Sequence, residues 1–266
     1  AALRARYGDK DARWRGPWND TLATMLAHRS VRRFTERAVD DDTLTALVAA
    51  AQSASTSSNL QSWSVVAVRD PERKRALRQL AGDQAFIEQA PVVLVWVADF
   101  SRAAQLADDA GVALAAADLV ESTIVGMVDA ALASQNALVA AESLGLGGVY
   151  IGAMRNDPDG VAELLGLPPR AMAVAGLAIG HPDPTDTAGV KPRLPQSAVL
   201  HHERYDPEAA AAGSAAYESA LGDYYASQGR PVSWRQTVLR RLSDYQNLSG
   251  REHLRAALER RGLPSR

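Results

Sequence analysis

The stretch GMVDAALASQNALVAAESL, residues 126–144, runs directly into GLGGVYIG, residues 145–152. The first part is apolar on almost every side, which is typical of a helix in the middle of a molecule. The second part contains a short β-rich run, Gly148–Ile151. A buried helix followed at once by a strand predicts a core in which helices pack densely around one sheet.

The glycines of residues 145–152 resemble a dinucleotide-binding fingerprint only superficially. That fingerprint needs a strand before the glycines and a helix after them, so that the helix N-terminus faces the pyrophosphate. Here the helix comes first, so we interpret Gly145 as a helix C-cap. Gly152, at the end of the strand, has two readings: a turn glycine, or a point where main-chain N–H groups approach a flat ligand.

Further elements are indicated on both sides of this centre. Strands are predicted at Trp63–Val68, Pro91–Ala98 and Met172–Ile179, and the uninterrupted run PVVLVWVA is typical of a buried strand. Helices are predicted at Thr21–Arg29, Asp40–Gln52, Asp70–Leu80, Asp206–Ala226 and Ser233–Tyr245. Strands dispersed among more numerous helices predict an α+β fold.

Composition narrows the possible functions. The 266 residues carry 29 Lys and Arg against 31 Asp and Glu, a net charge of -2, which disfavours a nucleic-acid binder. With 0 Cys, thiolate nucleophiles and Cys-type metal sites are excluded. The longest apolar run, Pro91–Ala98, is too short for a membrane span, and Ala1–Trp18 is too charged for a signal peptide. We expect a cytoplasmic protein that acts without a membrane.

Two basic segments, HRSVRRF at residues 28–34 and KPRLP at residues 191–195, suggest an anion site. Arginine matches phosphate oxygens bidentately, and the prolines stiffen the second segment. Each segment alone also fits a solvated basic loop. A third run, STSSNLQ at residues 55–61, offers hydroxyls and amides for the polar edge of a ring or a polyol, or is a plain serine-rich connector.

Other chemistries find little support. The chain has no G-x-S-x-G and no H-E-x-x-H, and His201 and His202 are adjacent in a predicted loop. We therefore expect no metal site and no catalytic side-chain nucleophile.

Taken together, these segments resemble the nitroreductase family of FMN-dependent oxidoreductases, in particular its NADPH-preferring branch of oxygen-insensitive nitroreductases and flavin reductases. The resemblance is carried by HRSVRRF, STSSNLQ, AESLGLGGVYIG at residues 141–152 with the following Arg155-Asn156, and KPRLP. It implies a nitroreductase-like α+β fold with a central, mainly antiparallel sheet, and an intertwined homodimer. It also implies an FMN-binding core over residues 19–205 and a C-terminal helical excursion over residues 206–266.

The resemblance further implies which residues contact FMN. The phosphate and the ring edge would be held by His28, Arg29, Ser30, Arg32, Lys191 and Arg193. The serine-rich loop would meet the flavin through Thr56, Ser57 and Asn59, and Gln84 would touch the ring or the ribityl chain. Main-chain amides near flavin N5 would come from Tyr150, Ile151, Gly152 and Ala153.

The implied activity is a ping-pong cycle in which NAD(P)H reduces the flavin and a small acceptor, such as a nitroaromatic, a quinone or a free flavin, is then reduced by two electrons. No side chain needs to act as acid or base. Among the departures from the family pattern, Ala153 replaces a usual glycine, Thr56 interrupts the serine run, and Gln228 stands where an arginine binds the NADPH 2′-phosphate. Arg230, two residues later, could take the place of that arginine, so either NADPH or NADH is expected. A non-catalytic binder of flavin or of a phosphorylated metabolite is the alternative.

Overall fold

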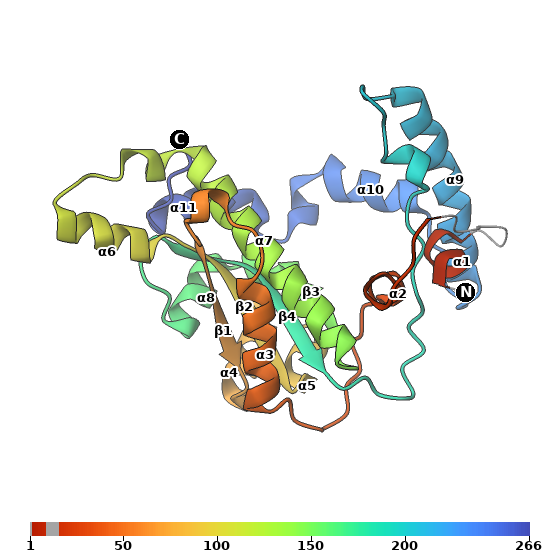
Figure 1. Cartoon of the computed structure of the whole chain (residues 1–266), viewed down its shortest axis with the longest axis horizontal. Coiled ribbons are helices and arrows are strands. Elements are labelled where there is room, and N and C mark those ends of the chain that lie inside the picture. The colour runs from red at the N-terminus through yellow and green to blue at the C-terminus, as the bar shows by residue number, and fades with distance from the viewer. Residues whose placement is uncertain (1, 9–15) are drawn as a thin grey trace. The chain divides into compact units, whose positions relative to one another are not determined.

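The computed structural model describes residues 2–8 and 16–266. Within them, one antiparallel sheet has four strands in the order β1-β2-β4-β3 (Figure 1). Their bounds are β1 (Trp63–Val68), β2 (Val92–Asp99), β3 (Gly147–Ile151) and β4 (Ala171–Gly180). The α+β class and the antiparallel sheet are confirmed.

The central strand β2 is buried along its whole length because helices cover both faces of the sheet. On one face, Leu94 and Trp96 pack in a cluster with residues of α3 (Asp41–Gln52) and α7 (Val120–Ser143). On the other face, the cluster around Val93 and Val95 takes in residues of three further helices, α4 (Pro71–Leu80), α5 (Phe86–Gln89) and α8 (Pro158–Leu165). Successive side chains of a strand point to opposite faces, so an apolar run without alternation suits this position.

The central helix α7 begins six residues before Gly126, where the sequence placed its start, and the predicted start is corrected. Gly126 lies inside the helix, and a Cβ there would stand 2.7 Å from Cε2 of Phe100 and 3.1 Å from Cβ of Ala98. The glycine therefore allows close packing and does not mark an end. By length and composition α7 would also suffice to cross a membrane, a property that core helices of soluble proteins share.

The end of α7 agrees with the C-cap interpretation. Gly145 has φ +78°, a left-handed conformation that glycine adopts without strain. The Gly145 N–H donates to the carbonyl of Glu142, and the Leu146 N–H donates to the carbonyl of Ala141, which is the Schellman pattern. β3 then starts at Gly147, so the helix-then-strand order that argues against a dinucleotide fingerprint is confirmed.

The other predicted helices are present, with ends shifted by at most a few residues. They are α2 (Asp20–Ala27), α3, α4, α9 (Pro207–Ala226) and α10 (Trp234–Ser243). Each begins directly after an N-cap residue whose side chain accepts a backbone N–H of the first turn. In the same order, these N-cap residues are Asn19, Asp40, Asp70, Asp206 and Ser233. The sequence did not indicate α1 (Ala2–Tyr7), α5, α6 (Ser101–Ala110), α8 or α11 (Leu254–Arg260).

The chain forms two compact units. The sheet unit comprises residues 30–186 and 248–266, and the helical unit comprises residues 1–29 and 187–247. The C-terminal residues join the sheet unit at the start of α7, where the hydroxyls of Thr123 and Ser265 are 2.6 Å apart and the Val120 N–H donates to the carbonyl of Arg266. The functional division after residue 205 remains an expectation from sequence.

Candidate functional site

In the sheet unit, the segment after α2 lies along the edge strand β3. Ser30 forms a parallel bridge with Gly148, and the Val31 N–H donates to the Gly148 carbonyl at 3.0 Å. The approach requires a glycine at position 147, where a Cβ would stand 2.5 Å from Cγ2 of Val31. The structure thus brings Ser30 beside the strand that carries Tyr150 and Ile151.

At the end of β3, the Tyr150 ring is held by a hydrogen bond, and the backbone at Gly152 has free space beside it. Tyr150 is 38% exposed, and its hydroxyl donates to Oγ of Ser134 on α7 at 2.9 Å. Burial raises the pKa of Tyr150 despite the opposing hydrogen bond to Ser134, so its phenol stays neutral at physiological pH. Ile151 is buried beneath, and a Cβ added at Gly152 would meet nothing closer than the Arg155 guanidinium at 3.5 Å.

The serine loop, residues 56–62, has an unusual backbone. It contains the 3-10 turn η1 (Ser57–Asn59) and three non-glycine residues with positive φ: Ser58 at 49°, Asn59 at 56° and Gln61 at 52°. Such conformations cost free energy and persist only where the surroundings over-determine them, often at functional sites. The side chains of Ser57 and Asn59 are exposed, whereas Thr56 is half-buried and its Oγ1 accepts the Gln61 N–H at 2.9 Å.

Asp129 on α7 holds this loop from below. Its side chain is buried, with 2% exposure. Oδ1 accepts the Ser57 N–H at 3.1 Å, and Oδ2 accepts the Ser62 N–H at 3.0 Å. The sequence reasoning missed Asp129. A carboxylate in the middle of a largely apolar helix was a usable signal, because buried charges require specific partners.

Arg102 on α6 holds the C-terminal end of the loop through its carbonyls. Its Nη2 donates to the carbonyls of Gln61 at 2.7 Å and Trp63 at 2.8 Å. Its Nη1 donates to Oγ of Ser64 and pairs with Asp99 at 3.2 Å. Burial alone would raise the pKa of Asp99, but hydrogen bonds from Ser101 and Ser64 and the charge of Arg102 outweigh it and hold that pKa below its ordinary value.

Arg32 and Gln84 lie near the start of α5. Arg32 is exposed, with Cζ 5.8 Å from the centroid of the Phe86 ring. Gln84 is half-buried, and its Nε2 donates to the carbonyl of Ala81 at 3.0 Å, closing the turn that leaves α4. Ala153, at the start of the 3-10 turn η3 (Gly152–Arg155), is 8% exposed and packs in the same hydrophobic cluster as Ile87 of α5.

In the helical unit, Arg6 joins the two basic segments. Its guanidinium is buried and donates to the carbonyls of His28 at 2.6 Å and Leu26 at 2.9 Å. It also donates to the carbonyl of Lys191 at 3.1 Å, and the Arg193 N–H donates to the Arg6 carbonyl at 2.8 Å. His28 and the KPRLP segment, more than 160 residues apart in the chain, therefore lie together. No sequence pattern pointed to Arg6.

The basic loop, residues 188–193, is fixed by further donors to its carbonyls. Nη1 of Arg29 donates to Ala188 at 3.1 Å. Two tyrosines seven residues apart on α9, Tyr217 and Tyr224, donate their hydroxyls to Pro192 and Gly189, each at 3.1 Å. These donors come from segments distant in the chain, so the conformation of the loop depends on tertiary contacts.

Two basic side chains gather at one aromatic ring. Nζ of Lys191 is 5.3 Å from the centroid of Tyr225, and Cζ of Arg230 is 5.9 Å from it. Arg193 is exposed and makes longer bonds, 3.2 and 3.3 Å, to carbonyls of its own loop. Lys191, Arg193 and Arg230 thus belong to one unit, in which Tyr225 brings two of them together.

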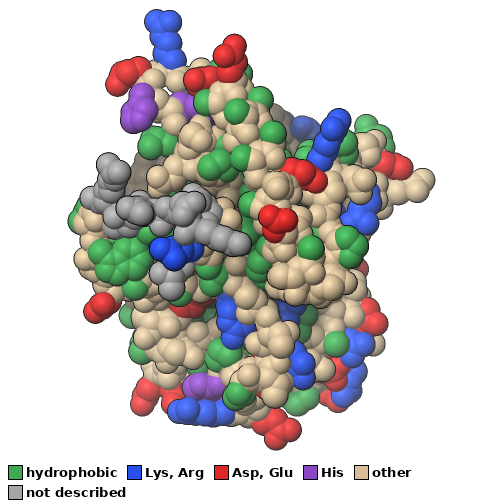
Figure 2. All heavy atoms as spheres, turned by 90° about the vertical axis from the view of Figure 1, so that its right-hand side faces the viewer, with side chains coloured by type: hydrophobic (Ala, Val, Ile, Leu, Met, Phe, Trp, Pro, Cys, Tyr) green, Lys and Arg blue, Asp and Glu red, His purple; other side chains and the backbone are tan. Residues whose placement is uncertain are grey.

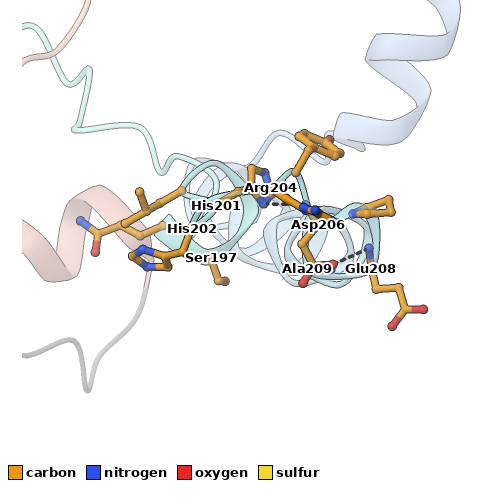
Figure 3. A pocket seen from close by; sticks show the side chains of 11 residues that line it. Ser197, His201, His202, Arg204, Asp206, Glu208 and Ala209 are labelled. Carbon is orange, nitrogen blue, oxygen red and sulfur yellow. Dashed lines mark hydrogen bonds between the residues drawn. The ribbon is translucent and has the colours of Figure 1, made fainter.

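A pocket of about 750 Å³ also lies in the helical unit, within residues 196–209 (Figure 3). The His201 ring contacts the Tyr205 ring with centroids 4.3 Å apart and planes tilted by 44°, and the Asp206 N–H donates to Nδ1 of His201 at 3.2 Å. None of the residues predicted to contact FMN lines this pocket. The face drawn in Figure 2 carries Lys and Arg interspersed with Asp and Glu, which agrees with the small net charge.

Comparison with known families gives two matches that cover most of the chain. Residues 25–181 match the model of the nitroreductase family, and residues 191–266 match that of the nitroreductase family C-terminal domain. The first match contains the serine loop and the end of β3, and the second contains Lys191, Arg193 and Arg230.

Individual relatives are similar over nearly their whole length. The NADPH-flavin oxidoreductase of Vibrio harveyi is 39% identical over 93% of this chain and 100% of its own. The oxygen-insensitive NADPH nitroreductase of Salmonella typhimurium is 41% identical over 84% and 90%. A solved structure, the Vibrio harveyi NADPH:FMN oxidoreductase complexed with NAD+, aligns with a TM-score of 0.81 and 38% identity over 93% and 100% of the two chains.

Proposed function

The chain belongs to the nitroreductase family, and from this membership we propose that it is an FMN-dependent NAD(P)H oxidoreductase. Its acceptors would be small molecules such as nitroaromatics, quinones or free flavins. The observation that carries the proposal is the 39% identity to an NADPH-flavin oxidoreductase along all of that relative's length. Similarity of this extent includes both the sheet unit and the helical unit.

The side chains and amides available fit FMN chemically. A dianionic phosphate requires cations, and the residue types of Arg29, Arg32, Lys191 and Arg193 meet that requirement. A flat ring with a polar edge requires an open backbone and short polar side chains, which the sheet unit offers at Gly152 and in the serine loop. We propose these groups as the FMN contacts, together with His28, Ser30, Gln84, Tyr150, Ile151 and Ala153.

FMN would supply the two-electron redox chemistry between NAD(P)H and the acceptor. The chain's own residues would bind and orient it. The cations would hold the phosphate, the serine loop would position the polar edge of the ring, and the main-chain amides after Tyr150 would donate to the ring. The neutral Tyr150 phenol, fixed to Ser134, keeps the end of β3 in place. Orientation of this kind lowers the barrier without an acid or base from the protein.

Arg230 is our proposed contact for the nicotinamide donor. It is exposed and lies over the Tyr225 ring, where Lys191 also lies. A guanidinium there can donate two hydrogen bonds to the 2′-phosphate of NADPH. Gln228, two residues earlier, is neutral, so the discrimination against NADH rests on Arg230 and is expected to be modest.

We propose that the protein works as a homodimer in the cytoplasm. Four apolar residues spaced four apart on α7 form an exposed stripe: Val120, Ile124, Val128 and Leu132, each 44–51% exposed. An apolar stripe of this length on a central helix suits burial against a second copy. Ile124→Glu should convert a dimer into monomers in light scattering, and a wild-type monomer would contradict this part of the proposal.

The test of the activity is spectroscopic. Purified protein supplied with FMN should be yellow, with the flavin retained through gel filtration. Under anaerobic conditions, NADPH or NADH should bleach the colour, and a nitroaromatic or quinone should restore it. Protein that does not retain FMN would contradict the cofactor assignment. Protein that retains FMN but is not bleached by either donor would instead be a flavin binder.

A further inference from the structure

We propose that Asp129 and Arg102 are positioning residues that clamp the serine loop in the shape that FMN binding requires. The inference rests on the proposed function, because it takes the loop as part of the FMN site. Neither side chain is among the groups expected to touch FMN. Both act through the loop backbone, one from α7 and the other from α6.

The first step of the argument is the burial of Asp129. A carboxylate that is 2% exposed on an apolar helix loses its hydration, which is costly unless hydrogen bonds replace it. Its two oxygens each accept one backbone N–H, from residues five apart in the loop. A small apolar residue would pack there with a lower desolvation cost. The presence of a carboxylate is therefore explained by its hydrogen bonds to the loop.

The second step is the complementarity of the two anchors. Asp129 accepts the N–H groups of Ser57 and Ser62, whereas Arg102 donates to the carbonyls of Gln61 and Trp63. A carboxylate can only accept and a guanidinium can only donate, so the two side chains satisfy different backbone groups. The N–H of Gln61 donates to Oγ1 of Thr56. The backbone is thus held by the protein itself before any ligand arrives.

The third step is the strain in the loop. Ser58, Asn59 and Gln61 have left-handed backbones, and non-glycine residues in this region are costly. Without the clamp these residues would relax to more favourable conformations. The exposed side chains of Ser57 and Asn59 would then point elsewhere, and FMN would have to reorder the loop at the expense of its affinity.

Asp129→Asn tests the clamp with almost no change in size. An asparagine offers one oxygen, and its NH2 group faces an N–H donor where the second oxygen was. Glu121→Gln is the matched control, since Glu121 is an exposed carboxylate on the same helix. Arg102→Gln is the second variant. Its side chain is 55% exposed, so this change preserves folding if Asp129→Asn does not.

Four measurements separate positioning from general stability: the Kd of FMN by fluorescence quenching, the visible circular dichroism of the bound flavin, hydrogen exchange, and the unfolding midpoint of the apoprotein. Loss of one charge-assisted bond predicts a Kd about tenfold higher in Asp129→Asn, and a smaller rise in Arg102→Gln. Exchange should accelerate in residues 56–63 but not in β2, and the dichroism at saturating FMN should change.

A rescue completes the test. Ser58→Gly removes the cost of a left-handed residue outside the expected FMN contacts, so adding it to Asp129→Asn should recover part of the lost affinity. Wild-type Kd and dichroism in both clamp variants would overturn the inference, as would uniform destabilisation without rescue. Failure of the wild-type protein to bind FMN would instead contradict the proposed function.

Discussion

The serine loop and the basic loop are both fixed through their backbones, but by different means. The serine loop has strained residues and is clamped by one carboxylate and one guanidinium, Asp129 and Arg102, from helices of its own unit. The basic loop has its carbonyls bonded by Arg6, Arg29 and two tyrosines of α9. In both cases helices and distant segments satisfy the backbone, which leaves loop side chains available for a ligand.

The two loops should differ in how many segments are affected when one anchoring side chain is lost. In the serine loop, each anchor serves one short segment, so its loss should be local. In the basic loop, Arg6 bonds both the end of α2 and Lys191, so a single side chain holds two basic segments together. The comparison predicts that Arg6 is the most sensitive position in the helical unit, even though it lies outside the expected FMN contacts.

The largest effect is expected for Arg6→Ala. Three carbonyls lose a charged donor, which costs about 3 kcal/mol, or roughly a hundredfold in affinity if His28 and Lys191 separate. The FMN Kd and the unfolding midpoint should both change. Arg4→Ala, an exposed arginine on the same helix, is the control and should behave as wild type. Equal FMN Kd values and unfolding midpoints in the two variants would contradict the prediction that Arg6 holds the two basic segments together.

A smaller effect is expected for Arg193→Ala. The side chain is exposed, so the unfolding midpoint should stay the same, whereas loss of one bidentate phosphate contact should raise the FMN Kd about tenfold. Arg240→Ala, which removes an exposed arginine from α10, should leave the Kd unchanged. An unaltered Kd in Arg193→Ala would remove this residue from the proposed phosphate site.

The smallest effect is expected for Asp99→Asn, and it should depend on pH. The pKa of Asp99 is lower in the folded protein than its ordinary value of 3.8, so its ionised form stabilises the fold above that pH. The stabilisation disappears as pH falls through the folded pKa. At pH 7 the variant should lose about 1 kcal/mol in urea unfolding. That difference should shrink in acid, and a pH-independent difference would contradict the assignment.

Much of the fold followed from patterns along the chain. The apolar run of β2, the caps Asp40 and Asp70 and the glycine after α7 each act within a few residues, so the sequence predicts them. The start of α7 could not be predicted, because Gly126 is required by Phe100, a contact across the core. Short helices such as α5 and α8 were missed because four to eight residues carry little periodicity.

The candidate site divides in the same way. Residue types that suit a phosphate or a flavin edge were visible as motifs, since the residue type alone fixes which donor, acceptor and charged groups a side chain offers. The partners that fix them, Asp129, Arg102 and Arg6, were not identified, because hydrogen bonds to backbone groups impose no residue pattern on the segment that receives them.

The sequence by itself determined the α+β class, the position of the central helix and strands, and the residues with the right chemistry for an anionic, flat ligand. Only the tertiary structure decided that His28 lies beside Lys191 and that the serine loop closes on Asp129. The physical reason is range: caps, turns and periodicity arise between near neighbours, whereas these contacts join residues that only folding brings together.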